Sequence, residues 1–140
     1  MTTFEELAIM LDEVKDGLPT DIYKELNGGV IWSPDVKMHP EALKSGDLYI
    51  MGEYHNDRQG YGGLGRYIII YFGSFMKLYS YLPPKRQKEQ LSDILKHELT
   101  HHWESLAGER DLEVQDAIDM ARYRQMHDTK PSYRLRRSEP

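Results

Sequence analysis

The stretch His97-Glu98-Leu99-Thr100-His101 lies within residues 84–107, a segment with the pattern of one long helix. Proline is favourable in the first turn of a helix, so Pro84 is a suitable start. Leucines recur there at the spacing of one buried face: Leu91, Leu95, Leu99 and Leu106. His97 and His101 are one turn apart on another face, so both imidazole rings can reach a single ion. The sequence therefore predicts a metal-binding helix that packs through its leucines.

Glu98 lies about 100° around this helix from His97, which places its carboxylate beside the ion and not on it. A bound zinc ion lowers the pKa of its water towards neutrality, and a neighbouring carboxylate can take the proton. We therefore predict His97 and His101 as zinc ligands and Glu98 as the general base. His102 points about 100° away from His101. We expect it to pack or to support a ligand.

A zinc site needs a third protein ligand, and four downstream carboxylates are candidates. We expect the metal helix to end at Gly108, with a second helix over residues 109–126 returning antiparallel to it. Glu113 and Asp116 then flank the level of His101. Glu113 ranks first because its longer side chain spans the gap between helices, and the others follow in this order: Asp116, Asp111 and Glu104.

The remaining residues predict an α+β domain. Residues 3–15 form an amphipathic helix, with Thr3 and Glu6 spaced as a capping box, and residues 20–26 form a second, shorter helix. The predicted strands form a small three-stranded sheet: residues 30–32, 48–51 and 66–72. Residues 54–65, with four glycines, predict a turn or mobile loop, and residues 73–81 a further helix.

Composition narrows the functional classes. The chain has 140 residues and no cysteine, so any metal must be held by His, Asp or Glu. A net charge of −5 gives no reason to expect nucleic-acid binding. The start of the chain lacks the pattern of a signal peptide, and the longest apolar run is too short to span a bilayer. We expect a cytoplasmic monomer that does not bind membranes.

The chain divides into two parts by composition. Residues 1–126 carry the periodic apolar residues of one domain. Residues 127–140 carry little apolar content and several basic residues: Lys130, Arg134, Arg136 and Arg137. We predict that this second part is a flexible basic tail.

The residues from His97 to His102 and from Glu104 to Glu113 resemble a small bacterial family of zincin-like metallopeptidases. The resemblance implies a minimal zincin-like fold: N-terminal helices, a small sheet, the HExxH helix and a C-terminal packing helix. It also implies one Zn²⁺ ion and hydrolysis of peptide bonds in a peptide or protein substrate by a metal-bound water that Glu98 activates. Where the commoner family form has glycine three residues after the second histidine, this chain has Glu104. Aligning Leu112-Glu113 with the family's Leu-x-Glu favours Glu113 as the third ligand.

Zincins commonly bind an extended peptide along a strand edge near the metal. We expect residues 67–72 to supply that edge and residues 54–65 to close over it. Four side chains are candidates to stabilise an oxyanion: Tyr54, His55, Tyr61 and Arg66. The alternative function is a catalytically degenerate zincin that acts as a metal-stabilised binding module.

Overall fold

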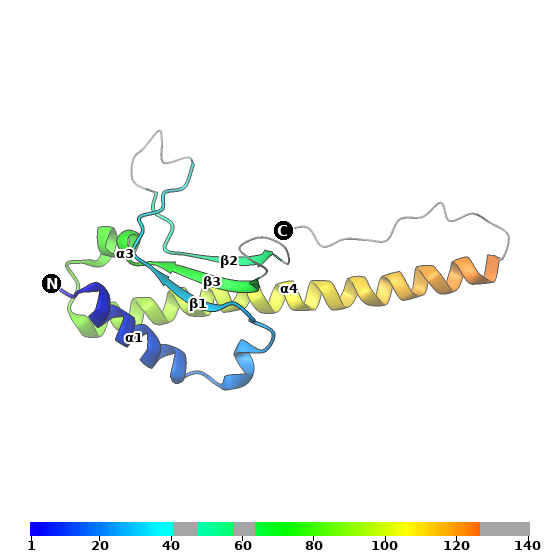
Figure 1. Ribbon diagram of the computed structural model, residues 1–140, viewed down its shortest axis with the longest axis horizontal. Coiled ribbons are helices and arrows are strands. Elements are labelled where there is room, and N and C mark those ends of the chain that lie inside the picture. The colour runs from blue at the N-terminus through cyan, green and yellow to red at the C-terminus, as the bar shows by residue number, and fades with distance from the viewer. Residues whose placement is uncertain (41–47, 58–63, 127–140) are drawn as a thin grey trace. The chain divides into compact units, whose positions relative to one another are not determined.

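The computed structural model describes residues 1–40, 48–57 and 64–126 (Figure 1). Within these ranges, the side chains of residues 57, 110–113 and 125–126 are not described. The predicted flexible tail, residues 127–140, lies outside the described residues, as does most of the glycine-rich part of the predicted loop. The chain forms two compact units, Met1–His102 and Trp103–Pro140. The predicted domain boundary after residue 126 stays a prediction.

The first unit is built on a three-stranded mixed sheet, which confirms the predicted α+β class for the described part of the chain. Its strands are β1 (Gly29–Ser33), β2 (Gly52–Asp57) and β3 (Gly65–Tyr71), in the order β1-β3-β2. β1 pairs parallel to β3, and β2 pairs antiparallel to β3. β3 is the central strand. Its residues are apolar on both faces, so both faces can be buried, whereas a strand with alternating polar residues would keep one face exposed.

Helix α1 (Phe4–Asp16) begins as the sequence predicts. The Thr3 hydroxyl accepts a hydrogen bond from the Glu6 amide at 3.1 Å, and the Glu6 carboxylate accepts one from the Thr3 amide at 2.9 Å. This capping box satisfies two amides that would otherwise lack partners in the first turn. One face of α1 is buried through Leu7, Leu11 and Val14.

Two further helices complete the core. Helix α3 (Phe72–Tyr79) follows β3 directly, and α4 (Pro84–Met126) contains the HExxH motif. The predicted leucine face of α4 is confirmed at Leu91, Leu95 and Leu99, each at most 1% exposed. These leucines belong to one hydrophobic cluster with Ile68 and Ile70 of β3 and with the buried face of α1.

The helix predicted over residues 20–26 is shorter in the structure. Only Thr20–Tyr23 is helical, as the 3-10 helix η1. Lys24 leaves the helical region with ψ 131°, and Glu25 has a positive φ of 63°. The Leu26 amide donates to the Tyr23 carbonyl at 3.0 Å, so residues 23–26 form a turn that ends the helix.

The second strand was predicted four residues too early. Residues 48–51 contribute only an isolated bridge between Met38 and Tyr49. The strand β2 instead covers Gly52–Asp57, so it begins after the predicted strand and includes the first residues of the predicted loop 54–65. The physical reason is pairing: β2 is held by its register with β3, from Gly52 opposite Ile70 to Asp57 opposite Gly65. A strand held by backbone pairing at the side of a sheet does not require a continuous apolar run.

The predicted helix end at Gly108 is also wrong. Gly108 lies inside α4, which runs without interruption to Met126, so no separate C-terminal packing helix is formed in the described residues. Glycine costs only about 1 kcal/mol in a helix interior. Its neighbours Leu106, Ala107 and Glu109 are strong helix formers, and they outweigh that cost. Across the residues searched, no helix has both the length and the apolar character needed to cross a membrane.

Replacing Gly108 by alanine tests this correction. Nothing lies within 4 Å of the position that a Cβ would take there. Alanine should therefore stabilise α4 by about 0.5–1 kcal/mol, because glycine loses more backbone entropy on folding. Thermal unfolding followed by circular dichroism measures the change. The reverse change at the exposed neighbour, Ala107→Gly, is the matched control and should cost a similar amount. Destabilisation by Gly108→Ala would instead indicate a left-handed helix end at this position.

Candidate metal centre

His97 and His101 lie together on the exposed face of α4. Their Nε2 atoms are 3.2 Å apart, and their rings meet nearly at right angles, with centroids 4.8 Å apart and an interplanar angle of 84°. Their burial pattern follows from helical periodicity: each is about 200° around the helix from a buried leucine two residues away. The core therefore turns both imidazoles outward, as the sequence predicts.

The spacing of the two nitrogens fits a zinc ion. Two nitrogens, each about 2.0–2.1 Å from a tetrahedral zinc ion, lie about 3.3–3.4 Å apart. The observed separation of the Nε2 atoms is 3.2 Å, so a small shift of either ring accommodates the ion. His97 and His101 are thus able to act as two of its ligands through Nε2.

Glu98 is buried beside this pair, with 7% of its surface exposed. Burial raises the pKa of its carboxyl above the usual range, and the positive charges of protonated His97 and His101 act in the opposite direction. A cation held by the two imidazoles would likewise lower the pKa of Glu98. The carboxylate therefore lies next to the two imidazoles, in surroundings that favour accepting a proton.

Strand β2 lies against Glu98, at a position that the sequence does not indicate. A Cβ on Gly52 would be 3.4 Å from Cγ of Glu98 and 3.2 Å from Cγ2 of Ile94. Glycine therefore allows α4 to approach the strand closely. No sequence pattern marks Gly52 as part of the site, because its neighbour Glu98 is supplied by a helix far along the chain.

The outer strand near the motif is not the strand that the sequence predicted. Residues 67–72 were expected to supply the free edge near the metal, but β3 is the central strand, paired on both sides. β2 and β1 are the outer strands of the sheet in the described residues, and β2 contains Gly52 beside Glu98. The edge next to the motif is therefore that of β2.

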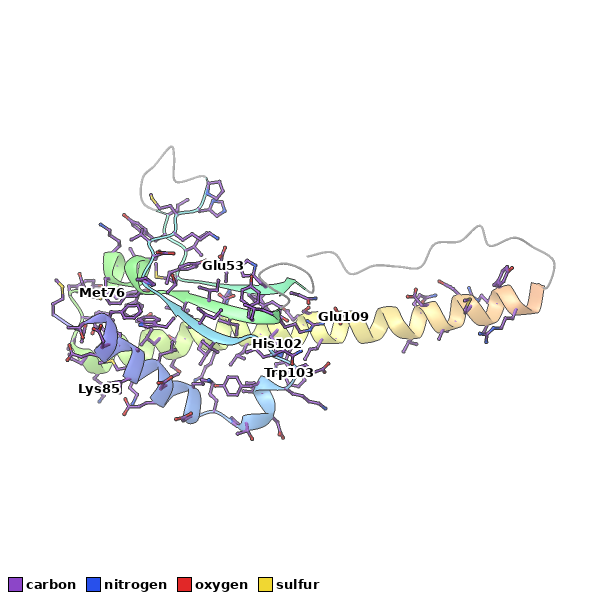
Figure 2. The ribbon with its side chains drawn as sticks, viewed as in Figure 1. Glu53, Met76, Lys85, His102, Trp103 and Glu109 are labelled. Atoms are coloured by element: carbon purple, nitrogen blue, oxygen red, sulfur yellow. The ribbon has the colours of Figure 1, made fainter. Side chains whose placement is uncertain are left out.

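Glu53 and His55 lie on the face of β2 opposite to Gly52 and Tyr54. Oε1 of Glu53 accepts hydrogen bonds from Nζ of Lys37 at 2.7 Å and from the Tyr71 hydroxyl at 2.6 Å, and lies 3.3 Å from Nε2 of His55. Burial acts to raise the pKa of Glu53, but the hydrogen bonds from these three side chains outweigh it and lower the pKa. Figure 2 shows Glu53 and His102 on opposite sides of the sheet.

His102 is fully buried, in agreement with the predicted packing role. Its Nε2 lies 2.8 Å from the carbonyl oxygen of Lys24, and its Nδ1 lies 2.9 Å from the Tyr54 hydroxyl. Nη1 of Arg66 donates to the same hydroxyl at 2.8 Å. Burial lowers the pKa of His102, and the positive charge of Arg66 adds to that effect.

These contacts bear on the four side chains predicted to stabilise an oxyanion. The Tyr54 hydroxyl bonds to His102 and accepts from Arg66, and the His55 ring stacks on Tyr67 with centroids 5.0 Å apart. Tyr61 lies outside the described residues. The structure thus brings Tyr54 and Arg66 together in a buried network and does not assign either to a substrate.

The third ligand is not identified by geometry. Among the described side chains, no group of three His, Asp or Glu residues is arranged to hold a metal ion. Glu113 and Asp111, two of the four candidates, belong to the second unit and their side chains lie outside the described set. The hairpin that favoured Glu113 is not formed, so this ligand stays a prediction supported by the alignment of Leu112-Glu113.

Comparisons with known proteins support the fold. No family model matches the chain, and no curated protein matches it. A similar solved structure is that of a conserved hypothetical protein from Thermo thermophilus, with 29% sequence identity and a TM-score of 0.64. The similarity covers 76% of this chain and 99% of that one. The likeness therefore extends over the whole of that protein, whose description names no activity.

Zinc should stabilise the folded protein. An ion that binds only the folded state, at 100 times its dissociation constant, adds about 2.7 kcal/mol to the free energy of unfolding. We expect zinc to raise the Tm of the wild type and His101→Ala to lose that increase. His39→Ala, which changes a histidine outside the motif, should keep it. An equal Tm for the metal-free and zinc-loaded wild type would contradict zinc binding at His97 and His101.

Proposed function

We propose that this protein is a zinc-dependent peptidase of the zincin type. The observation that carries the proposal is the pair of Nε2 atoms 3.2 Å apart, with the carboxylate of Glu98 buried beside them. The spacing suits two ligands of one zinc ion, and Glu98 occupies the position of a general base. The likeness at 29% identity to a conserved hypothetical protein is compatible with this function but supplies no activity.

In the proposed reaction, His97 and His101 hold the ion and Glu98 handles the proton. The zinc ion supplies Lewis acidity, which polarises a carbonyl oxygen and makes a water molecule acidic near neutral pH. Glu98 would take one proton from a water molecule as the water oxygen bonds to the carbonyl carbon of the peptide, and would pass that proton to the amine nitrogen as the C–N bond breaks. Its burial favours the protonated form that this second transfer requires.

The edge of β2 is the proposed place for the substrate backbone. An extended peptide can add to an outer strand through main-chain hydrogen bonds, with its side chains alternating between the two faces. β2 is an outer strand whose Gly52 lies next to Glu98, so a peptide bound along it would pass close to the carboxylate.

Glu98→Gln tests the general base. Glutamine keeps the size of the side chain and one acceptor oxygen, but its amide cannot accept the proton, so cleavage should fall about 100-fold or more. Cleavage of a diverse peptide library by mass spectrometry measures the loss, and zinc content by elemental analysis should remain unchanged.

The matched control is Glu89→Gln, the same change at an exposed position of α4 where the carboxylate pairs with Arg86 at 3.0 Å. It should retain full activity. Wild-type activity in Glu98→Gln would disprove the role of Glu98. A wild type that binds zinc and cleaves no peptide in the library would favour the alternative, a degenerate zincin that acts as a binding module.

Zinc titration of alanine variants tests the third ligand. We expect Glu113→Ala to weaken zinc binding more than alanine at the other candidates: Asp116, Asp111 and Glu104. The remaining basis for this order is the resemblance of Leu112-Glu113 to the family pattern. A loss confined to Glu104→Ala would place the ligand one turn after His101 on the uninterrupted helix α4 and would refute Glu113.

A further inference from the structure

The second part of α4, residues 103–126, differs in burial from the part that carries the HExxH motif. Burial on α4 extends as far as His102, and none of the described side chains after it is buried. At 1.5 Å per residue, this second part of the helix is about 36 Å long. A helix of this length has little stability of its own in water, and helices in proteins are stabilised mainly by packing an apolar face.

Apolar side chains share one side of this second part of α4. At about 100° per residue they fall within an arc of about 100°, which is the width of the packing face of an amphipathic helix. All of them are exposed, with Val114 at 56% and Ile118 at 43%. Arg110 is the only charged residue whose position lies within the same arc. We call this set the apolar face of α4: Trp103, Ala107, Val114, Ala117, Ile118 and Ala121.

The charges along the same segment are separated by sign. Residues 104–119 carry six carboxylates and one arginine. Residues 120–126 carry two arginines and no carboxylate, and residues 127–140 add four basic and two acidic side chains. Two copies of this helix lying parallel would set their acidic segments against each other, which is unfavourable. Two antiparallel copies set the acidic segment of each towards the basic end of the other.

We propose that two copies of this chain pair through the apolar face of α4, with the two helices antiparallel. Such a pair has a two-fold axis, so one surface serves both copies and is its own complement. With Val114 at the axis, Ala107 lies at the level of Ala121 in the other copy, and Glu104 at the level of Arg124. The same register thus overlaps the apolar faces and brings opposite charges to the same level.

The proposed pairing is independent of the proposed metal centre. A monomer was expected from the sequence, and the exposed apolar face is the reason for proposing a dimer instead. Contacts along one helix form a small interface, so the pair should be weak and should form in a concentration-dependent way. Sedimentation equilibrium of the full chain, from about 10 μM to 1 mM, measures the dissociation constant of the dimer. A chelator in the buffer prevents zinc from bridging two copies.

Ile118→Glu tests the surface. It places a carboxylate in the centre of the proposed interface, and the dissociation constant of the dimer should rise at least about 10-fold. The matched control is Ile9→Glu, the same change at a side chain of α1 that is 61% exposed. It should leave the dissociation constant unchanged. Because both positions are exposed, both variants should fold, and far-ultraviolet circular dichroism checks this.

Spin labels test the orientation, because the chain has no cysteine of its own. Gln115→Cys and Arg122→Cys place a label on the same flank of α4, about 20° apart around the helix. In the antiparallel pair, the two labels are offset along the helix axis by about 3 Å at residue 115 and about 24 Å at residue 122. In a parallel pair the offset is near zero at both positions. Pulsed electron paramagnetic resonance should therefore give a longer distance for Arg122→Cys than for Gln115→Cys.

Three outcomes would overturn the inference. A wild type that stays monomeric up to 1 mM would show that the apolar face does not pair. A dimer with the same dissociation constant in Ile118→Glu as in the wild type would place the interface on another surface. Equal label distances at residues 115 and 122 would indicate parallel helices and would refute the antiparallel arrangement.

Discussion

The contact between the leucine face of α4 and the isoleucines of β3 determines where the rest of the site lies. Leu91, Leu95 and Leu99 are buried against a cluster that includes Ile68 and Ile70. Fully burying a leucine contributes about 1.5–3 kcal/mol, so this face outweighs any single polar contact in the unit. Once it is buried, a repeat of 3.6 residues leaves His97 and His101 exposed and turns Glu98 towards β2. The geometry of the candidate metal centre is thus a consequence of core packing.

Burial of the Glu98 carboxylate is unfavourable for the stability of the folded protein. The carboxylate loses water on burial, and this loss raises its pKa. Glu53 contributes a second negative charge that also raises the pKa of Glu98. A cation between His97 and His101 would offset both effects. The raised pKa of Glu98 is in keeping with the proposed binding of a positive ion beside it.

Three elements of the predicted secondary structure are wrong: the helix over residues 20–26 is too long, the strand over residues 48–51 is misplaced, and the helix end at Gly108 is not formed. The apolar residues 48–51 suggested a strand, but pairing with β3 selected the more polar Gly52–Asp57. Gly108 suggested a helix end, but a single glycine between strong helix formers leaves α4 intact. The capping box at Thr3 and Glu6 was predicted correctly because its hydrogen bonds span only three residues. The position of β2 could not be predicted in this way, because it depends on pairing with a strand elsewhere in the chain.

The sequence by itself determined the HExxH motif and the helix face that carries its two histidines. The i, i+4 spacing of His97 and His101 and the leucine spacing opposite them are properties of any α-helix, so they required no knowledge of the fold. Only the tertiary structure decided that Gly52 lies beside Glu98, that β2 supplies the outer edge near the motif, and that His102 bonds to Tyr54 and Lys24. These contacts join residues 46, 48 and 78 positions apart. They depend on sheet register and on the backbone angles of one turn, and neither leaves a periodic signal in the sequence.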